Sequence, residues 1–304
     1  MPPYEVLKSD AVSQDLLTAM EQAKTDAETA ATNAAQSLAA AGQAAADAVN
    51  AKTDVESEVA QLEGLADGFF AGRFMGQVPG QRLVLNFAED DGTTLYSENY
   101  PVREFTRLTA GSPTYQFFST ATGVPYVRFA SSAGFSTSAA AWNTFAGPLC
   151  AFVCYRPAAA NSSGKLLSRF STSGQRSYHA FLAGGKLNIA VSGDGSAQVS
   201  QQIGTLSQVA QTGWNAACMI YEPGVRLEGW NLGEGTTLGN DALTSGIPSQ
   251  LSDGGGIDLG IAHRPGVGEH FDGDIALIQL AAGIPDDALV QDLLSYAIAR
   301  LTGA

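Results

Sequence analysis

Residues 177–191 read Ser-Tyr-His-Ala-Phe-Leu-Ala-Gly-Gly-Lys-Leu-Asn-Ile-Ala-Val, two runs rich in apolar and aromatic residues joined by Gly184-Gly185. Paired glycines adopt positive φ angles without steric cost, so they suit the tight turn of a hairpin. Both flanking runs contain residue types that are enriched in strands. The stretch therefore predicts an antiparallel β-hairpin in which residues 177–182 pair with residues 186–191.

Similar short runs recur on both sides of this hairpin and are separated by turn residues. They are residues 82–87, 125–130, 149–155, 214–221, 225–230, 257–261 and 275–280. Many short strands joined by Gly-rich turns are typical of a two-layer antiparallel sandwich, so residues 80–304 are predicted to form a mainly-β head. After Pro285, Asp286 or Asp287 is expected to cap a short helix. The residues expected to face inward from this helix are Leu289, Leu293, Tyr296 and Ile298 or Leu301.

The first part of the chain has the opposite character. No proline occurs between Tyr4 and Val78, and alanine, the best helix former, dominates. One heptad register keeps apolar residues at almost all a and d positions from Leu17 to Ala66, which indicates a coiled-coil stalk over residues 11–66. The a and d positions form the apolar seam through which the helices of a coiled coil contact one another. The largest residues of this seam are Leu17, Met20, Leu38, Val55, Val59 and Leu62. Such a helix, roughly 80 Å long, requires parallel self-association, because an isolated helix of this kind is marginal in water. A helical hairpin turning near Gly42 is the alternative.

Glycine and phenylalanine characterise a neck over residues 67–79. The glycines are predicted to end the helix, and Phe69, Phe70, Phe74 and Met75 lie among them. We expect these side chains to form an apolar plug where identical chains meet; the alternative is that they pack on their own head. Residues 1–10 are expected to form an N-terminal anchor segment, in which Pro2-Pro3-Tyr4 is expected to be non-helical.

Composition excludes several classes of function. The net charge is −14 and no run of Lys or Arg occurs, so nucleic acid, which is bound by basic surfaces, is not an expected partner. No segment has the ~18 consecutive apolar residues of a membrane helix, so no membrane insertion is expected. The N-terminus, Met-Pro-Pro-Tyr-Glu, lacks the basic and apolar regions of a signal peptide, which predicts synthesis in the cytoplasm. The three cysteines, Cys150, Cys154 and Cys218, are expected to be buried and unbridged.

The order of elements in the head resembles the laminin-G/concanavalin A-like jelly roll. The matching signs are Tyr126-Val-Arg-Phe129, the strand 149–155, the hairpin 177–191, the strand from Trp214 to Tyr221, and Phe271-Asp-Gly-Asp-Ile275 before the terminal helix. This resemblance implies that fold for residues 80–303.

The stalk resembles the Ala/Ser/Thr/Asp-rich coiled coils of tailed-phage fibres and spikes, and gene transfer agents carry similar head spikes. Stalk and head together imply a virion fibre or spike subunit on the particle surface. The resemblance also implies a homotrimer whose N-terminus attaches to capsid or tail proteins and whose head binds host surface polysaccharide.

Aromatic faces and planar polar groups on loops are the usual contacts of a sugar. They make Trp142, Tyr178, Trp230 and Arg264 the candidate ligand contacts. Asp272 and Asp274 form a candidate Ca²⁺ site, because carboxylate oxygens suit that ion; no other cofactor is expected.

No catalytic residues are assigned, and an enzyme is not expected. No Gly-x-Ser-x-Gly motif occurs. The Glu-x-Asp-x-x-Glu strand of sandwich glycanases, with its paired carboxylates, is also missing. His179 is expected in the core or at a strand edge, and His263 and His270 flank a loop. A polysaccharide-depolymerising spike and a purely structural adaptor for another fibre protein remain the alternative functions.

Overall fold

The protein is represented by a computed structural model that describes most of the chain. The described residues are 4–68, 70–74, 76–85, 87, 94–96, 104–107, 116–130, 133–172 and 174–303, with α1 side chains described at 14–49 and 51–52. The chain divides into two compact units, Met1–Leu65 and Ala66–Ala304.

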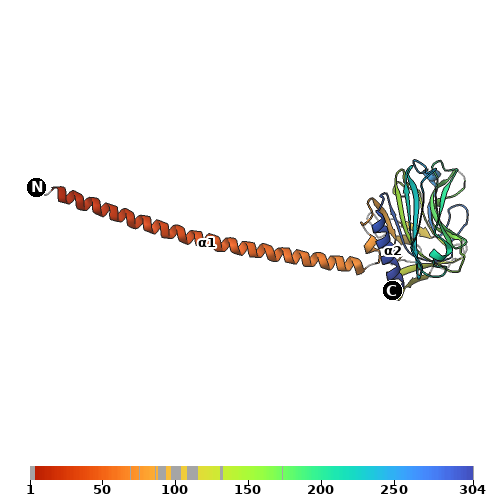
Figure 1. Cartoon of the computed structure of the whole chain (residues 1–304), viewed down its shortest axis with the longest axis horizontal. Helices are drawn as coiled ribbons and strands as arrows, with labels where there is room; N and C mark the ends of the chain where they lie inside the picture. The colour runs from red at the N-terminus through yellow and green to blue at the C-terminus, as the bar shows by residue number, and fades with distance from the viewer. Residues whose placement is uncertain are drawn as a thin grey trace. The chain divides into compact units, whose positions relative to one another are not determined.

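The N-terminal unit is one continuous helix, α1 (Tyr4–Gly68) (Figure 1). Its 65 residues correspond to about 98 Å at 1.5 Å per residue. The helix passes through Gly42 without a break, so the predicted single helix is confirmed and the hairpin alternative is wrong. It begins at Tyr4, so the expectation of a non-helical segment is wrong for Tyr4, whereas residues 1–3 lie outside the described residues. Neither described helix combines the length and apolarity of a membrane span.

Three predicted seam residues are exposed in the single chain. Leu17, Met20 and Leu38 are 59%, 65% and 75% exposed, so the helix itself does not bury these side chains. The side chains of Val55, Val59 and Leu62 lie outside the described residues.

The head contains two antiparallel sheets. Sheet A has the strand order β14-β13-β12-β7-β16-β5-β4, and β1 also pairs with β16. Its strands are β1 (Gln81–Leu85), β4 (Gln116–Ser119), β5 (Pro125–Phe129), β7 (Leu149–Pro157), β12 (Asn215–Glu222), β13 (Arg226–Gly233), β14 (Gly239–Leu243) and β16 (Gly273–Ala281). The pairings place β16 between β7 on one side and β5 with β1 on the other.

Sheet B has the order β11-β10-β9-β8-β15-β6-β3-β2. Its strands are β2 (Thr94–Tyr96), β3 (Glu104–Arg107), β6 (Phe135–Thr137), β8 (Gly164–Phe170), β9 (Arg176–Ala183), β10 (Lys186–Val191), β11 (Val199–Ile203) and β15 (Leu259–Ile261). The pairing of Leu182 with Leu187 across Gly184-Gly185 confirms the predicted hairpin. Short 3-10 helices lie at Gly72–Phe74, Leu206–Gln208 and Gly254–Gly256.

The main core lies between the inner faces of the two sheets. Alternation along β7 shows the division, since Val153 and Tyr155 belong to this core whereas Phe152 and Cys154 face the other side of sheet A. That outer side of sheet A carries a second core beneath α2 (Asp287–Thr302) (Figure 1). The two-layer antiparallel sandwich predicted from the sequence is therefore confirmed.

Helix α2 begins as predicted. The Asp286 carboxylate accepts a hydrogen bond from the Leu289 amide at 2.7 Å and caps the first turn. Its buried residues are Val290, Leu293, Leu294, Ala297 and Leu301, so Leu293 and Leu301 are confirmed as inward residues. Leu289, Tyr296 and Ile298 are only partly buried against the same core.

The neck packs on its own head. Phe70 and Phe74 are 3% and 0% exposed, and the Phe74 ring lies 5.7 Å from Phe152 and 6.4 Å from Tyr296 between centroids. The expectation of a plug between identical chains is therefore wrong for these two side chains. Phe69 and Met75 lie outside the described residues.

All three cysteines are free and buried, as predicted. Cys150 Sγ and Cys218 Sγ lie 3.6 Å apart on neighbouring strands, within the core covered by α2. These side chains act there as small apolar residues.

Candidate ligand-binding site

A buried aspartate with two arginine partners lies where β16 begins. The register of sheet A places Asp274 opposite Arg156 of β7 on one side and Arg128 of β5 on the other. Arg128 Nε donates to Asp274 Oδ1 at 2.8 Å, and Arg156 Nε donates to Oδ2 at 2.8 Å. Each arginine adds a second bond from Nη2 to Oδ2, at 3.2 Å for Arg128 and 2.5 Å for Arg156. Three separate strands thus fix one Arg–Asp–Arg triad.

Gly273 allows β16 to approach β7 closely at this point. Its φ angle is +152°, and a Cβ atom there would lie 2.3 Å from the carbonyl oxygen of Arg156 and 2.5 Å from the ring of Phe271. No side chain larger than hydrogen fits. The glycine of the Phe271-Asp-Gly-Asp-Ile275 segment therefore places Asp274 between its two arginines.

The charges of the triad leave a net positive end. The Asp274 side chain is only 4% exposed, whereas the side chains of Arg128 and Arg156 are 45% and 29% exposed. A buried carboxylate stays ionised only when it is paired and hydrogen-bonded. The bond to Asp274, opposed by burial, raises the pKa of Arg128 above its usual value. Two guanidinium groups share one carboxylate, so a formal charge of +1 faces the solvent side.

Aromatic rings hold the arginines in place. The Arg128 guanidinium lies 4.8 Å from the centroid of Phe118. That of Arg156 lies 5.3 Å from Tyr126 and 4.8 Å from Trp214. The rings contact one another, with Phe118 stacked on Tyr126 at 5.4 Å and Tyr126 edge-on to Trp214 at 5.3 Å. Stacking on aromatic faces restricts a guanidinium plane and adds cation–π attraction.

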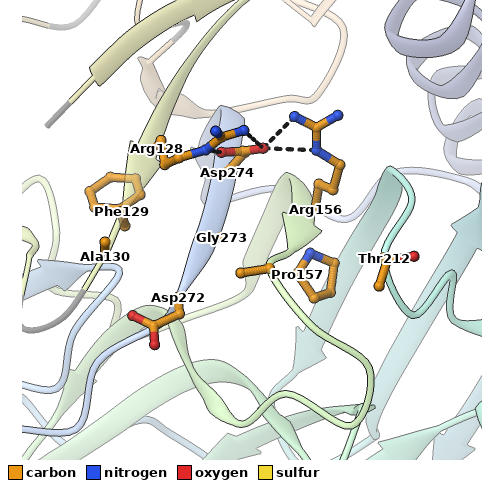
Figure 2. Close-up of a pocket in the computed structure, with 10 residues that line it drawn as sticks. Arg128, Phe129, Ala130, Arg156, Pro157, Thr212, Asp272, Gly273 and Asp274 are labelled. Carbon is orange, nitrogen blue, oxygen red and sulfur yellow. Dashed lines mark hydrogen bonds and ion pairs between the residues drawn. The ribbon is translucent and has the colours of Figure 1, made fainter.

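A cavity of about 570 Å³ opens beside the triad (Figure 2). We call it the arginine pocket; its lining residues are Arg128, Phe129, Ala130, Arg156, Pro157, Ala158, Thr212, Asp272, Gly273 and Asp274. Figure 2 shows the guanidinium groups on either side of the Asp274 carboxylate, with Asp272 at the other end of the pocket. The volume lies within the range of small-molecule sites.

The pocket offers donors at one end and acceptors at the other. The Nη1 groups of Arg128 and Arg156 donate to none of the described residues, so their N–H bonds remain for a ligand. The exposed Asp272 carboxylate is an acceptor, and the Thr212 hydroxyl serves as either. The Asp274 oxygens are occupied by arginine N–H groups, so this carboxylate is unsuited to act as a nucleophile or base. The arrangement suits binding of a polar molecule.

The expected calcium pair does not form. Asp274 is neutralised by its two arginines, and a Ca²⁺ ion beside them would be repelled. Figure 2 shows the Asp272 side chain well apart from that of Asp274. Within the described ranges, no group of three or more His, Cys, Asp or Glu side chains is placed to hold a metal ion.

The four predicted ligand contacts lie elsewhere. Tyr178 is fully buried and donates a hydrogen bond to the Asn143 carbonyl at 3.0 Å. Trp230 is 4% exposed and belongs to the core on the outer face of sheet A. Their expected exposure is therefore wrong, because inward packing occupies both rings. Trp142 is half-buried, with its ring 6.0 Å from Phe105. None of these three residues, nor Arg264, lines the arginine pocket.

Arg264 belongs to a second group of basic residues at sheet B. Its side chain is 16% exposed and pairs with Glu269 at 3.2 Å, and Lys165 Nζ lies 3.1 Å from the same carboxylate. Beside this group, the His179 ring stacks between Phe170 at 4.0 Å and Phe181 at 4.4 Å. His179 is 3% exposed and so is buried, but it lies on the outer face of sheet B and outside the main core, which contains its neighbours Tyr178 and Ala180.

Burial keeps the neighbouring histidines neutral. It lowers the pKa of His179 well below 6.5, and the positive charge of Lys165 adds to this effect. For His263, burial and the adjacent His270 lower the pKa to about 4. Neither ring nitrogen of His179 has a hydrogen-bond partner among the described residues. Protonation of these rings is therefore costly.

Sequence reasoning missed Arg128 and Arg156 as site residues. Both lie in or directly after strands that the sequence predicts, but no local pattern links them to Asp274. One signal in the sequence could have indicated them. Arg128 and Arg156 are basic residues next to apolar strand residues, and a basic residue in such a place needs a partner on an adjacent strand.

Comparisons with known proteins bear on the fold alone. No family model and no curated protein sequence matches this chain. Among solved structures, it is similar to the binding domain of Paraclostridial Mosquitocidal Protein 1, with a TM-score of 0.53 at 7% identity over 71% of this chain and 52% of that one. It is also similar to the binding domain of botulinum neurotoxin serotype G, with a TM-score of 0.51 at 7% identity over 71% of this chain and 50% of that one.

This chain spans about half the length of the solved chains it matches. The similarity shows a concanavalin A-like sandwich and so confirms the predicted fold class.

Proposed function

We propose that this chain is a fibre or spike subunit on a virion surface and that its head binds host surface carbohydrate without transforming it. The arginine pocket is the binding site in this proposal. The N-terminal end of the stalk attaches to capsid or tail proteins, and parallel copies of α1, three in number, form the stalk.

The donor and acceptor set of the arginine pocket carries the binding part of the proposal. A sugar presents hydroxyl groups that both donate and accept, and it is recognised by a few fixed polar groups in a concave site. Arginine N–H groups at one end and the Asp272 carboxylate at the other supply both kinds of contact. Pro157 and Ala158 provide a small apolar wall beside them.

The fold supports a binding role. The two solved structures that share it are binding domains by name. The concanavalin A-like sandwich hosts unrelated functions, so the argument rests on the site and the fold only agrees with it.

The stalk supports the fibre part of the proposal. A continuous helix with exposed Leu17, Met20 and Leu38 in one heptad register leaves an apolar seam that sister helices cover. Joining several heads on one stalk raises the avidity for a repetitive polysaccharide without new contacts, because the second binding event becomes intramolecular.

Binding of the full-length protein to immobilised polysaccharides tests this function. The panel contains neutral members (dextran, galactan and mannan) and acidic members (polygalacturonate and hyaluronate), and biolayer interferometry measures the response. We expect saturable binding to at least one member and no shortening of that polysaccharide on size-exclusion chromatography. Absence of binding to every member contradicts the proposal, and shortened products replace it with the depolymerase alternative.

A further inference from the structure

We infer that the arginine pocket selects a saccharide that carries a carboxylate, such as a uronate residue, and holds that carboxylate at Arg128 and Arg156. The inference rests on the proposed carbohydrate binding and adds the chemical class of the ligand. It follows from the charge, the geometry and the rigidity of the triad.

The triad end of the arginine pocket carries an excess positive charge, which favours binding of one more anion. Two guanidinium groups face a single buried carboxylate, and arginine does not lose its proton at any physiological pH. The unneutralised positive charge is therefore permanent. A ligand carboxylate completes a balanced arrangement of two cations and two anions, whereas a neutral hydroxyl leaves the excess charge in place.

Each arginine of the triad keeps one donor group that Asp274 does not use. Asp274 uses Nε and Nη2 of both side chains, and Nη1 of each donates to none of the described residues. Hydrogen bonds between guanidinium and carboxylate groups are charge-assisted and stronger than neutral ones. Each Nη1 group, one from β5 and one from β7, can donate such a bond to an oxygen of a ligand carboxylate.

The triad is preorganised, so little order must be gained on binding. Both guanidinium groups are already fixed by the Asp274 bonds and by the rings of Phe118, Tyr126 and Trp214. Rigid donors lose little side-chain entropy when a ligand binds. The buried Asp274 is thus a positioning residue that keeps the donors in place and limits their charge.

Asp272 makes the two ends of the arginine pocket chemically different. Its carboxylate lies at the end away from the guanidinium groups (Figure 2), where its oxygens can accept hydrogen bonds from sugar hydroxyls. The ligand is therefore acidic at one end and hydroxylated at the other, as a uronate is. Because the whole chain carries a charge of −14, nonspecific attraction of polyanions does not imitate this selectivity.

A matched pair of polysaccharides tests the inference on the full-length protein. Polygalacturonate and hyaluronate are each compared with their own carboxyl-reduced form, which has the same linkages and length but no charge. We expect at least tenfold weaker binding of the reduced form, a difference of about 1.4 kcal/mol, measured by isothermal titration calorimetry. Sulfated dextran is a further probe, and its binding as tightly as the uronates would show that any anion suffices and would overturn the selectivity.

Variants locate the effect. Arg128→Gln and Arg156→Gln each keep one arginine on Asp274, and each is expected to weaken binding of the acidic polysaccharide at least tenfold. Arg73→Gln is the matched control. The guanidinium of Arg73 pairs with Asp292 at 2.9 Å, and Arg73 does not line the arginine pocket. This variant should bind the acidic polysaccharide as tightly as the unmodified protein does. Circular dichroism verifies that each variant is folded.

The outcomes separate this inference from the proposed function. Equal binding of native and carboxyl-reduced forms, or binding of neutral polysaccharides alone, overturns the inference and leaves carbohydrate binding intact. If the protein binds no polysaccharide of the panel, both the inference and the proposed function are wrong. Selective binding that survives in both arginine variants moves the acidic specificity to another surface and also overturns the inference.

Discussion

Phe74→Ala gives the sharpest test of how the neck is built. The Phe74 ring is fully buried and makes three ring contacts, at 5.8 Å with Phe70, 5.7 Å with Phe152 and 6.4 Å with Tyr296. Truncating a buried phenylalanine to alanine costs about 3–5 kcal/mol, because apolar transfer is lost and a cavity remains. Three aromatic neighbours place Phe74 toward the upper part of that range.

This energy converts into a measurable change in thermal stability. For a domain of the size of the head, about 1 kcal/mol corresponds to a shift in Tm of roughly 2–4 °C, so the expected decrease is about 6–20 °C. Tryptophan fluorescence reports it, since Trp214 and Trp230 lie in the same apolar core as Phe74. Val225→Ala is the control, because Val225 is 51% exposed and its truncation should change stability by less than about 0.5 kcal/mol.

The oligomer mass of the same variant completes the test. If Phe74 stabilises its own head, native mass spectrometry should find the subunit number of Phe74→Ala equal to that of the unmodified protein. An unchanged Tm together with dissociation into single chains would refute the reasoning and restore the plug between copies.

Three further predictions concern charge, pH and assembly. Asp274→Asn should lower the free energy of unfolding by about 1–3 kcal/mol, because two partly exposed guanidinium groups lose their shared carboxylate; urea unfolding measures this, and an unchanged midpoint contradicts it. An unfolded histidine takes up a proton near pH 6.5, whereas folded His263 does so only near 4, so stability should decrease as the pH falls through that window, by roughly 3 kcal/mol from this residue. His179→Leu should make urea midpoints less dependent on pH over the same range, and an unaltered pH profile would exclude His179 as a contributor. Leu38→Asp should convert the assembled protein into single chains on light scattering, whereas Ser37→Asp, outside the seam, should not.

The strands that the sequence predicts are those with a clear local pattern. Residues 149–155 are a continuous apolar run that becomes β7, and residues 275–280, apolar except for Gln279, become β16. The glycine pair at 184–185 sets the register of β9 and β10. Strands such as β14, with the sequence Gly-Asn-Asp-Ala-Leu, carry no such pattern. They form because a neighbouring strand offers hydrogen-bond partners, and that information is not local.

The site is harder to predict than the fold for the same reason. The motif around Gly273 draws attention to Asp274, but its two partners are 146 and 118 residues away along the chain. The residue spacing within a short motif cannot reveal an ion pair between residues that are distant in sequence and become neighbours only through the strand order of the sheet. Tyr178 and Trp230 failed as candidates because the sequence does not show what covers the face of the strand on which a side chain lies. Tyr178 packs in the main core between the sheets, and Trp230 packs in the core on the outer side of sheet A.

The place of β16 in sheet A determines when the head can fold during synthesis. β16 ends at Ala281, follows every other described strand in the chain and fits between β7 and β5. β7 pairs with β12 and β5 with β4 on their other sides, but the edges of β7 and β5 that face β16 stay unpaired until the ribosome has released it. The helix α1 ends at Gly68, 281 − 68 = 213 residues earlier, and its backbone hydrogen bonds join residues only about one turn apart. At roughly 5–20 residues per second, nascent α1 is complete about 10–40 s before the sandwich can close. In the later part of that interval, after β7 has been synthesised, its unpaired edge and its apolar faces are exposed, which makes the emerging chain a substrate for chaperones.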